Sequence, residues 1–135
     1  MGLDLGTKTI GIAFSDIRLS IATARETLIR KKFTDDANRL IEQIKNEKVF
    51  AIVLGLPLNM DGSEGPRAQS TRAFAANLSK LIDLPICFQD ERLSTYAAEQ
   101  AMLEADISRK KRSKKIDAVA AAIILQGALD RIRQE

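Results

Sequence analysis

An uninterrupted apolar run from residue 49 to residue 56 constrains the fold more than any other part of the chain. A strand that is apolar at every position is buried on both faces, and such strands occur in sheets that helices cover on both sides. The run ends before Pro57, which cannot donate a hydrogen bond to a neighbouring strand. This segment therefore predicts an α/β domain.

The remaining segments fit that class. Ile10, Ile12 and Phe14 alternate with small or polar residues, and a short apolar segment around Asp4 precedes them across a glycine turn, which predicts a hairpin. Further elements are expected at residues 21–28 (strand), from Thr34 as N-cap (helix), from Pro66 (helix), at 84–88 (strand), and at about 94–105 and 116–131 (helices). With right-handed parallel crossovers, this order gives a mixed five-stranded sheet with helices on both faces, the arrangement of the ribonuclease H-like fold. We expect one domain over residues 1–135.

The chemical inventory of the chain is narrow, because it has no histidine and a single cysteine, Cys87. Histidine-dependent triads, histidine general bases, cysteine zinc sites and an intrachain disulfide are therefore excluded. An enzyme with this inventory would work with carboxylates, lysines and hydroxyls. Oxygen ligands suit hard cations, so a metal cofactor is expected to be Mg²⁺ or Mn²⁺.

Acidic residues stand at three positions where a carboxylate is unusual. Asp4 lies within an apolar strand, where an ionised carboxylate is costly unless a cation or several donors meet it. Asp90 and Glu91 follow a strand, at the end where open α/β sheets bind ligands. Asp117 shares a helix face with Ala121 and is expected to face the sheet. Carboxylates from these three places, clustered around one or two divalent ions, would supply the chemistry of phosphodiester hydrolysis.

Each of these acids also has a structural interpretation. Asp4 could accept hydrogen bonds from the turn that follows it, Asp90 could cap the next helix, and Asp117 could be an N-cap. Glu91 could pair with Arg92. Whether Asp90 is a further metal ligand is left open by the sequence.

The positive charge of the chain is concentrated in one segment. Net charge is +3, and six of the seven residues from 109 to 115 are Lys or Arg. We expect this run to be a mobile loop that contacts phosphates rather than bases, because no aromatic residue is interleaved to stack on bases. The residues expected to bind are Lys111, Arg112, Lys114 and Lys115. The alternative is a solvated loop without a ligand.

A polar loop follows the apolar run at residues 59–62 and is expected to line the edge of the sheet beside Glu91. Asn59 offers a donor and an acceptor to a nucleotide, and Gly62 suggests a turn residue with positive φ. A plain turn is the alternative. Lys8 and Arg92 are also expected to contact nucleic acid.

Four motifs, at residues 4–11, 55–62, 90–95 and 115–121, resemble the bacterial YqgF family, also called RuvX. The resemblance covers nearly the whole chain in the same order. It implies the ribonuclease H-like fold, with Asp4, Glu91 and Asp117 as the metal-binding acids. The family is described both as Holliday junction resolvases and as nucleases that mature the 5′ end of pre-16S rRNA. Only three residues precede Asp4, so the first strand is expected to be shorter than is usual in this fold.

We therefore expect a metal-dependent endonuclease that acts on structured RNA and processes the 5′ end of pre-16S rRNA. The alternatives are a resolvase of branched DNA, a non-catalytic nucleic-acid-binding module, and an actin-like or sugar-kinase ATPase. The last would need two such domains, and 135 residues supply one. No run is long enough to span a membrane and the N-terminus is unlike a signal peptide, so a cytoplasmic monomer or homodimer is expected.

Overall fold

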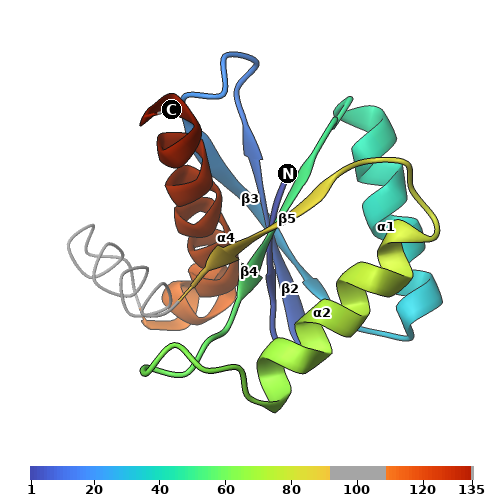
Figure 1. The fold of residues 1–135 in the computed structure, drawn as a ribbon. Coiled ribbons are helices and arrows are strands. Elements are labelled where there is room, and N and C mark those ends of the chain that lie inside the picture. Colours follow the sequence, from blue (N-terminus) through green and yellow to red (C-terminus); the bar gives the residue numbers. More distant parts are fainter. Residues whose placement is uncertain (92–108, 135) are drawn as a thin grey trace.

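The computed structural model describes the backbone of residues 1–91 and 109–134, and the side chains of residues 1–91 and 116–133. Figure 1 shows the order of the elements along the chain. The strands are β1 (Gly2–Leu5), β2 (Thr9–Ser15), β3 (Ala22–Ile29), β4 (Ile52–Leu56) and β5 (Ile86–Asp90). The helices are α1 (Phe33–Asn46), α2 (Pro66–Ser79) and α4 (Arg109–Gln134).

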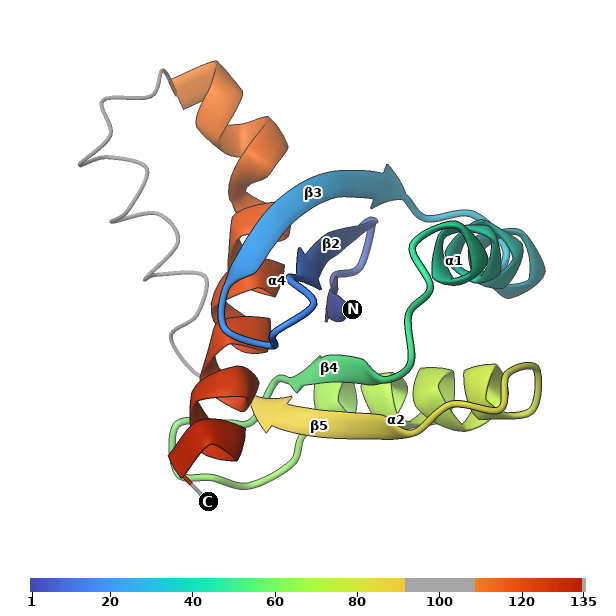
Figure 2. The same ribbon diagram turned by 90° about the horizontal axis from the view of Figure 1, so that it is seen from above.

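The five strands form one mixed sheet in the order β3-β2-β1-β4-β5. Strands β1, β2 and β3 pair antiparallel, whereas β4 pairs parallel with both β1 and β5. Helix α4 lies on one side of the sheet, and α1 and α2 lie on the other (Figure 2). The predicted hairpin, the mixed five-stranded sheet and the helices on both faces are confirmed. The central strand β1 has four residues and is as short as expected.

The two faces of the sheet differ in the size of their side chains. On the side of α1 and α2, Leu3, Ile10 and Ile12 are fully buried in the main apolar core together with Leu40 and Leu78. The opposite face carries small residues, because successive side chains along a strand point to opposite sides. Asp4 therefore shares with Gly2 the face that α4 covers.

Glycines let α4 approach the backbone of the sheet closely. A Cβ atom at Gly2 would lie 2.7 Å from Cβ of Leu125, and one at Gly11 would overlap the carbonyl group of Asp117. Gly11 is the antiparallel partner of Asp4. The start of α4 is thus held directly over the strand pair that carries Asp4.

Two sequence expectations about helix ends are wrong. Helix α4 begins at Arg109 rather than near residue 116, so the basic run forms the first turns of this helix and is not a loop. Lys and Arg have high helix propensity, which lets the helix extend beyond its apolar stripe. Helix α1 begins at Phe33 with Lys32 at the N-cap position and without a side-chain cap, so Thr34 is not the cap. The helix expected at 94–105 lies outside the described residues.

Candidate active site

Two carboxylates from distant parts of the chain meet at the edge of the sheet where β1, β4 and β5 end. Protonated Glu91 donates a hydrogen bond to the carboxylate of Asp4. The main-chain N–H of Glu91 donates to the carbonyl of Leu56 at 3.2 Å, which extends the β4–β5 pairing past the end of β5. Strand β4 separates the two acids in the sheet, and its Gly55 leaves the space between them open. A Cβ atom there would lie 2.5 Å from Oε2 of Glu91.

The surroundings of this pair favour the protonated state. Burial raises the pKa of Asp4, and the charge of Asp117 raises it further, while Arg67 and the hydrogen bond from Glu91 oppose the rise. Burial and the nearby Asp4 raise the pKa of Glu91 from 4.5 to about 8. Without a cation, the pair therefore holds a proton at neutral pH, since two half-buried carboxylates in contact do not both ionise readily.

The third predicted acid, Asp117, faces the pair from α4. Its charge acts on Asp4, but its Oδ2 atom accepts a hydrogen bond from the hydroxyl of Thr9 on β2. Among the residues that the structure describes, no group of three acidic side chains is arranged to hold a metal ion. Asp4 and Glu91 are thus brought into contact, and Asp117 is held beside them by Thr9.

The donor chemistry of the site nevertheless fits a hard cation. Asp4, Glu91 and Asp117 offer carboxylate oxygens only, and a divalent ion would take the place of the proton that Asp4 and Glu91 share. Metal ligation by the three acids stays a prediction.

The structure distinguishes Asp90 from Glu91. Asp90 pairs with Leu56 across β4 and β5. The pair two positions earlier, Leu54 and Phe88, packs in the core on the side of α1 and α2, and residues two apart on a strand share a face. Asp90 is exposed and, by the alternation along β5, lies on the face opposite to Glu91. Its charge still raises the pKa of Glu91. This placement favours Glu91 over Asp90 as a ligand.

The loop at residues 59–62 is held by bonds within itself. The main-chain N–H of Asn59 donates to the carbonyl of Ser63 at 2.8 Å, and its side-chain amide donates to the Ser63 hydroxyl at 3.0 Å. Gly62 has a φ of 89°, which confirms the expected positive φ. These contacts support the interpretation as a turn, and a contact between Asn59 and the substrate stays a prediction.

For the other predicted nucleic-acid-binding residues, the structure describes Lys8 and the backbone of the basic run. Lys8 is exposed in the turn between β1 and β2, close to Asp4 in the chain. The backbone of the basic run, which includes Lys111, Arg112, Lys114 and Lys115, forms the turns of α4 that lead into Asp117. Arg92 lies outside the described residues.

Two arginines at this edge were not singled out from the sequence. Nη2 of Arg67 donates to the carbonyl of Leu5 at 3.0 Å, and Nη1 of Arg30 donates to the carbonyl of Gly6 at 2.6 Å. Both carbonyls follow Asp4 directly in the chain. The one sequence signal for Arg67 is its position after Pro66, at the start of a helix that follows a loop at the ligand-binding edge.

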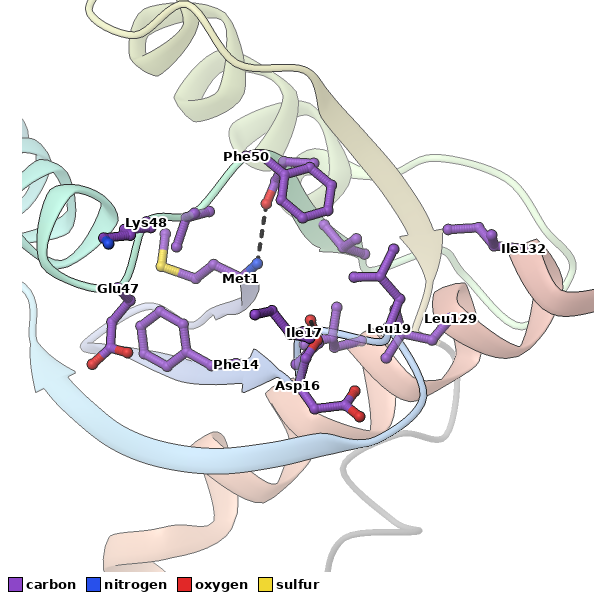
Figure 3. Close-up of a pocket in the computed structure, with 15 residues that line it drawn as sticks. Met1, Phe14, Asp16, Ile17, Leu19, Glu47, Lys48, Phe50, Leu129 and Ile132 are labelled. Carbon is purple, nitrogen blue, oxygen red and sulfur yellow. Dashed lines mark hydrogen bonds between the residues drawn. The ribbon is translucent and has the colours of Figure 1, made fainter.

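A separate apolar pocket of about 290 Å³ lies at the opposite end of β1, around Met1 (Figure 3). The α-amino group of Met1 donates to the carbonyl of Ala51 at 3.0 Å, and burial lowers its pKa to about 6. Phe14 and Leu129 line the pocket together with exposed apolar side chains of the surrounding loops. The pocket contains none of the predicted site residues. In the described part of the chain, no helix is long and apolar enough to cross a membrane.

Comparison with known proteins gives a consistent result over almost the whole chain. A family model described as "RuvX: Holliday junction resolvase" matches residues 1–131. A protein of Roseobacter denitrificans is 67% identical over 135 residues, which cover 98% of this chain and 83% of that protein. A protein of Ruegeria sp. is 65% identical over 133 residues (98% and 85%), and one of Bartonella tribocorum is 59% identical over 131 residues (97% and 84%). Each of the three carries the name "Putative pre-16S rRNA nuclease".

Proposed function

This chain belongs to the RuvX family, and from that premise we propose that it is a metal-dependent endonuclease that processes the 5′ end of pre-16S rRNA. The family accounts for the ribonuclease H-like sheet and helices, and the relatives carry a name that states a nuclease acting on pre-16S rRNA. Nucleic acid is the substrate class. We propose in addition that cleavage depends on Mg²⁺ or Mn²⁺ and that particular acids bind the ion.

The observation that carries the proposal is the contact between Asp4 and Glu91. Two half-buried acids that share a proton destabilise each other when ionised, and such pairs are typical of sites where an ion binds or a reaction takes place. Bound Mg²⁺ or Mn²⁺ would activate a water molecule and stabilise the leaving oxygen of the phosphodiester. The chain has no histidine that could do either.

Each acid then has a defined part. Asp4 and Glu91 would supply oxygen ligands from the ends of β1 and β5, on either side of β4, and Glu91 would have to give up its proton to bind the ion. Asp117, whose Oδ2 atom accepts from the hydroxyl of Thr9, would supply a third carboxylate from α4. The exposed Lys8 would offer positive charge to the phosphate backbone, and the Lys and Arg residues of the basic run would add to it, since their helix leads into Asp117.

A cleavage panel tests this function. Purified protein is mixed with pre-16S leader RNA, a four-way DNA junction, duplex and single-stranded substrates, each with Mg²⁺, Mn²⁺ or EDTA. We expect cleavage of the leader RNA that requires the cation and is lost in Asp4→Asn, which removes a charge and keeps the side-chain shape. Circular dichroism of Asp4→Asn checks that the fold is retained.

The description of the family model names a second candidate, a Holliday junction resolvase. Symmetric cleavage of the four-way junction with uncut leader RNA would favour this activity. A folded Asp4→Asn protein with full activity would contradict metal catalysis at these acids. Binding without cleavage of any substrate under all cation conditions would favour a non-catalytic module.

A further inference from the structure

Two guanidinium groups from separate elements converge on the turn that follows Asp4. Arg30 comes directly after β3, and Arg67 stands in the first turn of α2. They donate to the carbonyls of two consecutive residues, Gly6 and Leu5, at 2.6 and 3.0 Å. The main-chain N–H of Arg30 also donates to the carbonyl of Lys8 at 2.8 Å. Three cationic residues are thus fixed around one short turn.

Arg30 and Arg67 differ from Arg25 of β3 and Arg72 of α2 because neither forms a salt bridge within the described residues. In residues 1–91 and 116–133, the salt bridges join Arg25 to Glu47, Arg39 to Asp36, and Arg72 to Glu64. Arg30 and Arg67 instead each donate one hydrogen bond to a neutral carbonyl. A guanidinium has five N–H groups, so each keeps donors for another acceptor.

Both arginines lie on one side of the acids, the side of α1 and α2. Arg30 stacks over the ring of Phe74 with 5.9 Å between its Cζ atom and the ring centroid, which places it on the side of α1 and α2. Arg67 belongs to α2, and its charge acts on both Asp4 and Glu91. The basic turns of α4 lie on the other side of the sheet. The two guanidinium groups therefore lie on the side of α1 and α2, with Arg67 close enough to act on the charges of both acids.

We propose that Arg30 and Arg67 form a phosphate-binding subsite for the substrate strand, on the α2 side of the acids, with Lys8 beside them. The inference rests on the proposed nuclease function. Bidentate guanidinium groups match phosphate oxygens, and the carbonyl bonds hold both groups in place before the substrate arrives. The strand then crosses the sheet edge over the acids to this subsite.

A purely structural role for the two arginines is the competing explanation. A neutral amide could hold a backbone carbonyl as well as a guanidinium does. Two guanidinium groups that are held on neighbouring carbonyls also repel each other, a cost that a bound phosphate would offset. A phosphate-binding subsite therefore requires a positive charge at both positions, whereas a purely structural bond to a carbonyl does not.

The test compares two charge-matched double variants. Arg30→Gln with Arg67→Gln removes two charges and keeps N–H donors for the carbonyls. Arg25→Gln with Arg72→Gln removes two charges from the same two parts of the fold, where both are paired with Glu. Binding of fluorescent leader RNA is measured by anisotropy over a series of KCl concentrations, with EDTA present so that no cleavage occurs. Thermal melts check that each variant is folded.

We expect the slope of log K against log salt to fall by about 1.4 in the Arg30–Arg67 pair, since each lost single-strand phosphate contact contributes about 0.7. The control pair should keep the wild-type slope. Arg30→Lys with Arg67→Lys should recover most of the slope, because charge is retained.

Three results would overturn the subsite. These are a wild-type slope in the Gln pair, an equal loss in the control pair, or a Lys pair that behaves like the Gln pair. Wild-type protein that binds neither RNA nor DNA would instead overturn the proposed function, and the subsite with it.

Discussion

Replacing Glu91 by Gln should stabilise the protein at pH 8 in the absence of divalent cations and remove part of its pH dependence. In the folded protein, burial and Asp4 raise the pKa of Glu91 from 4.5 to about 8. Between these values the folded protein holds the proton and the unfolded chain releases it. Stability from this group is therefore complete below about 4.5 and is lost as the pH rises through about 8. The Gln amide keeps a donor toward Asp4 at every pH.

The size of the effect follows from the same shift. A rise in pKa from 4.5 to about 8 corresponds to an upper limit of about 5 kcal/mol. Because Glu91 and Asp4 share the proton and the site can relax, we expect about 2 kcal/mol between low and high pH. The Glu91→Gln protein should therefore gain about that much over wild type at pH 8.

Urea unfolding with EDTA at a series of pH values measures this difference. Asp83→Asn changes an exposed carboxylate and serves as the control, with a pH profile like that of wild type. Wild-type and Glu91→Gln proteins whose unfolding free energies change in parallel between pH 5 and 8 would refute the reasoning. The proton would then not reside on the Asp4–Glu91 pair.

Three further substitutions, one of them a control, test the framework of the site. Gly11→Ala places a methyl group onto the backbone of Asp117 and should destabilise the fold by about 3 kcal/mol in thermal melts. Gly65→Ala, whose nearest atom would lie 3.5 Å away, should cost less than about 1 kcal/mol, and equal effects would contradict the close contact of α4. Asn59→Ala should cost about 0.5–1 kcal/mol through its exposed bond to the loop and leave turnover unchanged. Lower turnover at saturating substrate with unchanged stability would instead show that the loop positions the substrate.

Much of the site geometry could be derived from periodicity. The alternation of the first strand and the apolar stripe around Asp117 placed that acid and Asp4 at one interface between helix and sheet. The crossover rule placed Glu91 at the same edge, through two parallel strands that both end there. These inferences succeed because each depends on a local repeat and on the general handedness of strand connections.

The details that sequence could not supply depend on contacts between segments far apart. The hydroxyl of Thr9 holds Asp117, 108 positions later, and nothing near either residue signals that bond. Arg67 donates to the carbonyl of Leu5, which lies 62 positions earlier in the chain. The basic turns of α4 were expected to be a loop because dense charge usually marks a solvated segment, whereas their helix is continuous with the apolar stripe packed on the sheet.

The position of Asp117 on α4 has a consequence for the order in which the protein becomes able to react. Every strand of the sheet precedes α4 in the chain, so the ribosome completes β1 to β5 before it makes the third acid. At about 5–20 residues per second, a growing chain spends seconds with Asp4 and Glu91 already synthesised and Asp117 still missing. The three acids come together only after α4 has left the ribosome and docked over Gly11. If catalysis uses all three acids, as proposed, a nascent chain would therefore be inert toward the RNA around it until its synthesis has passed that helix.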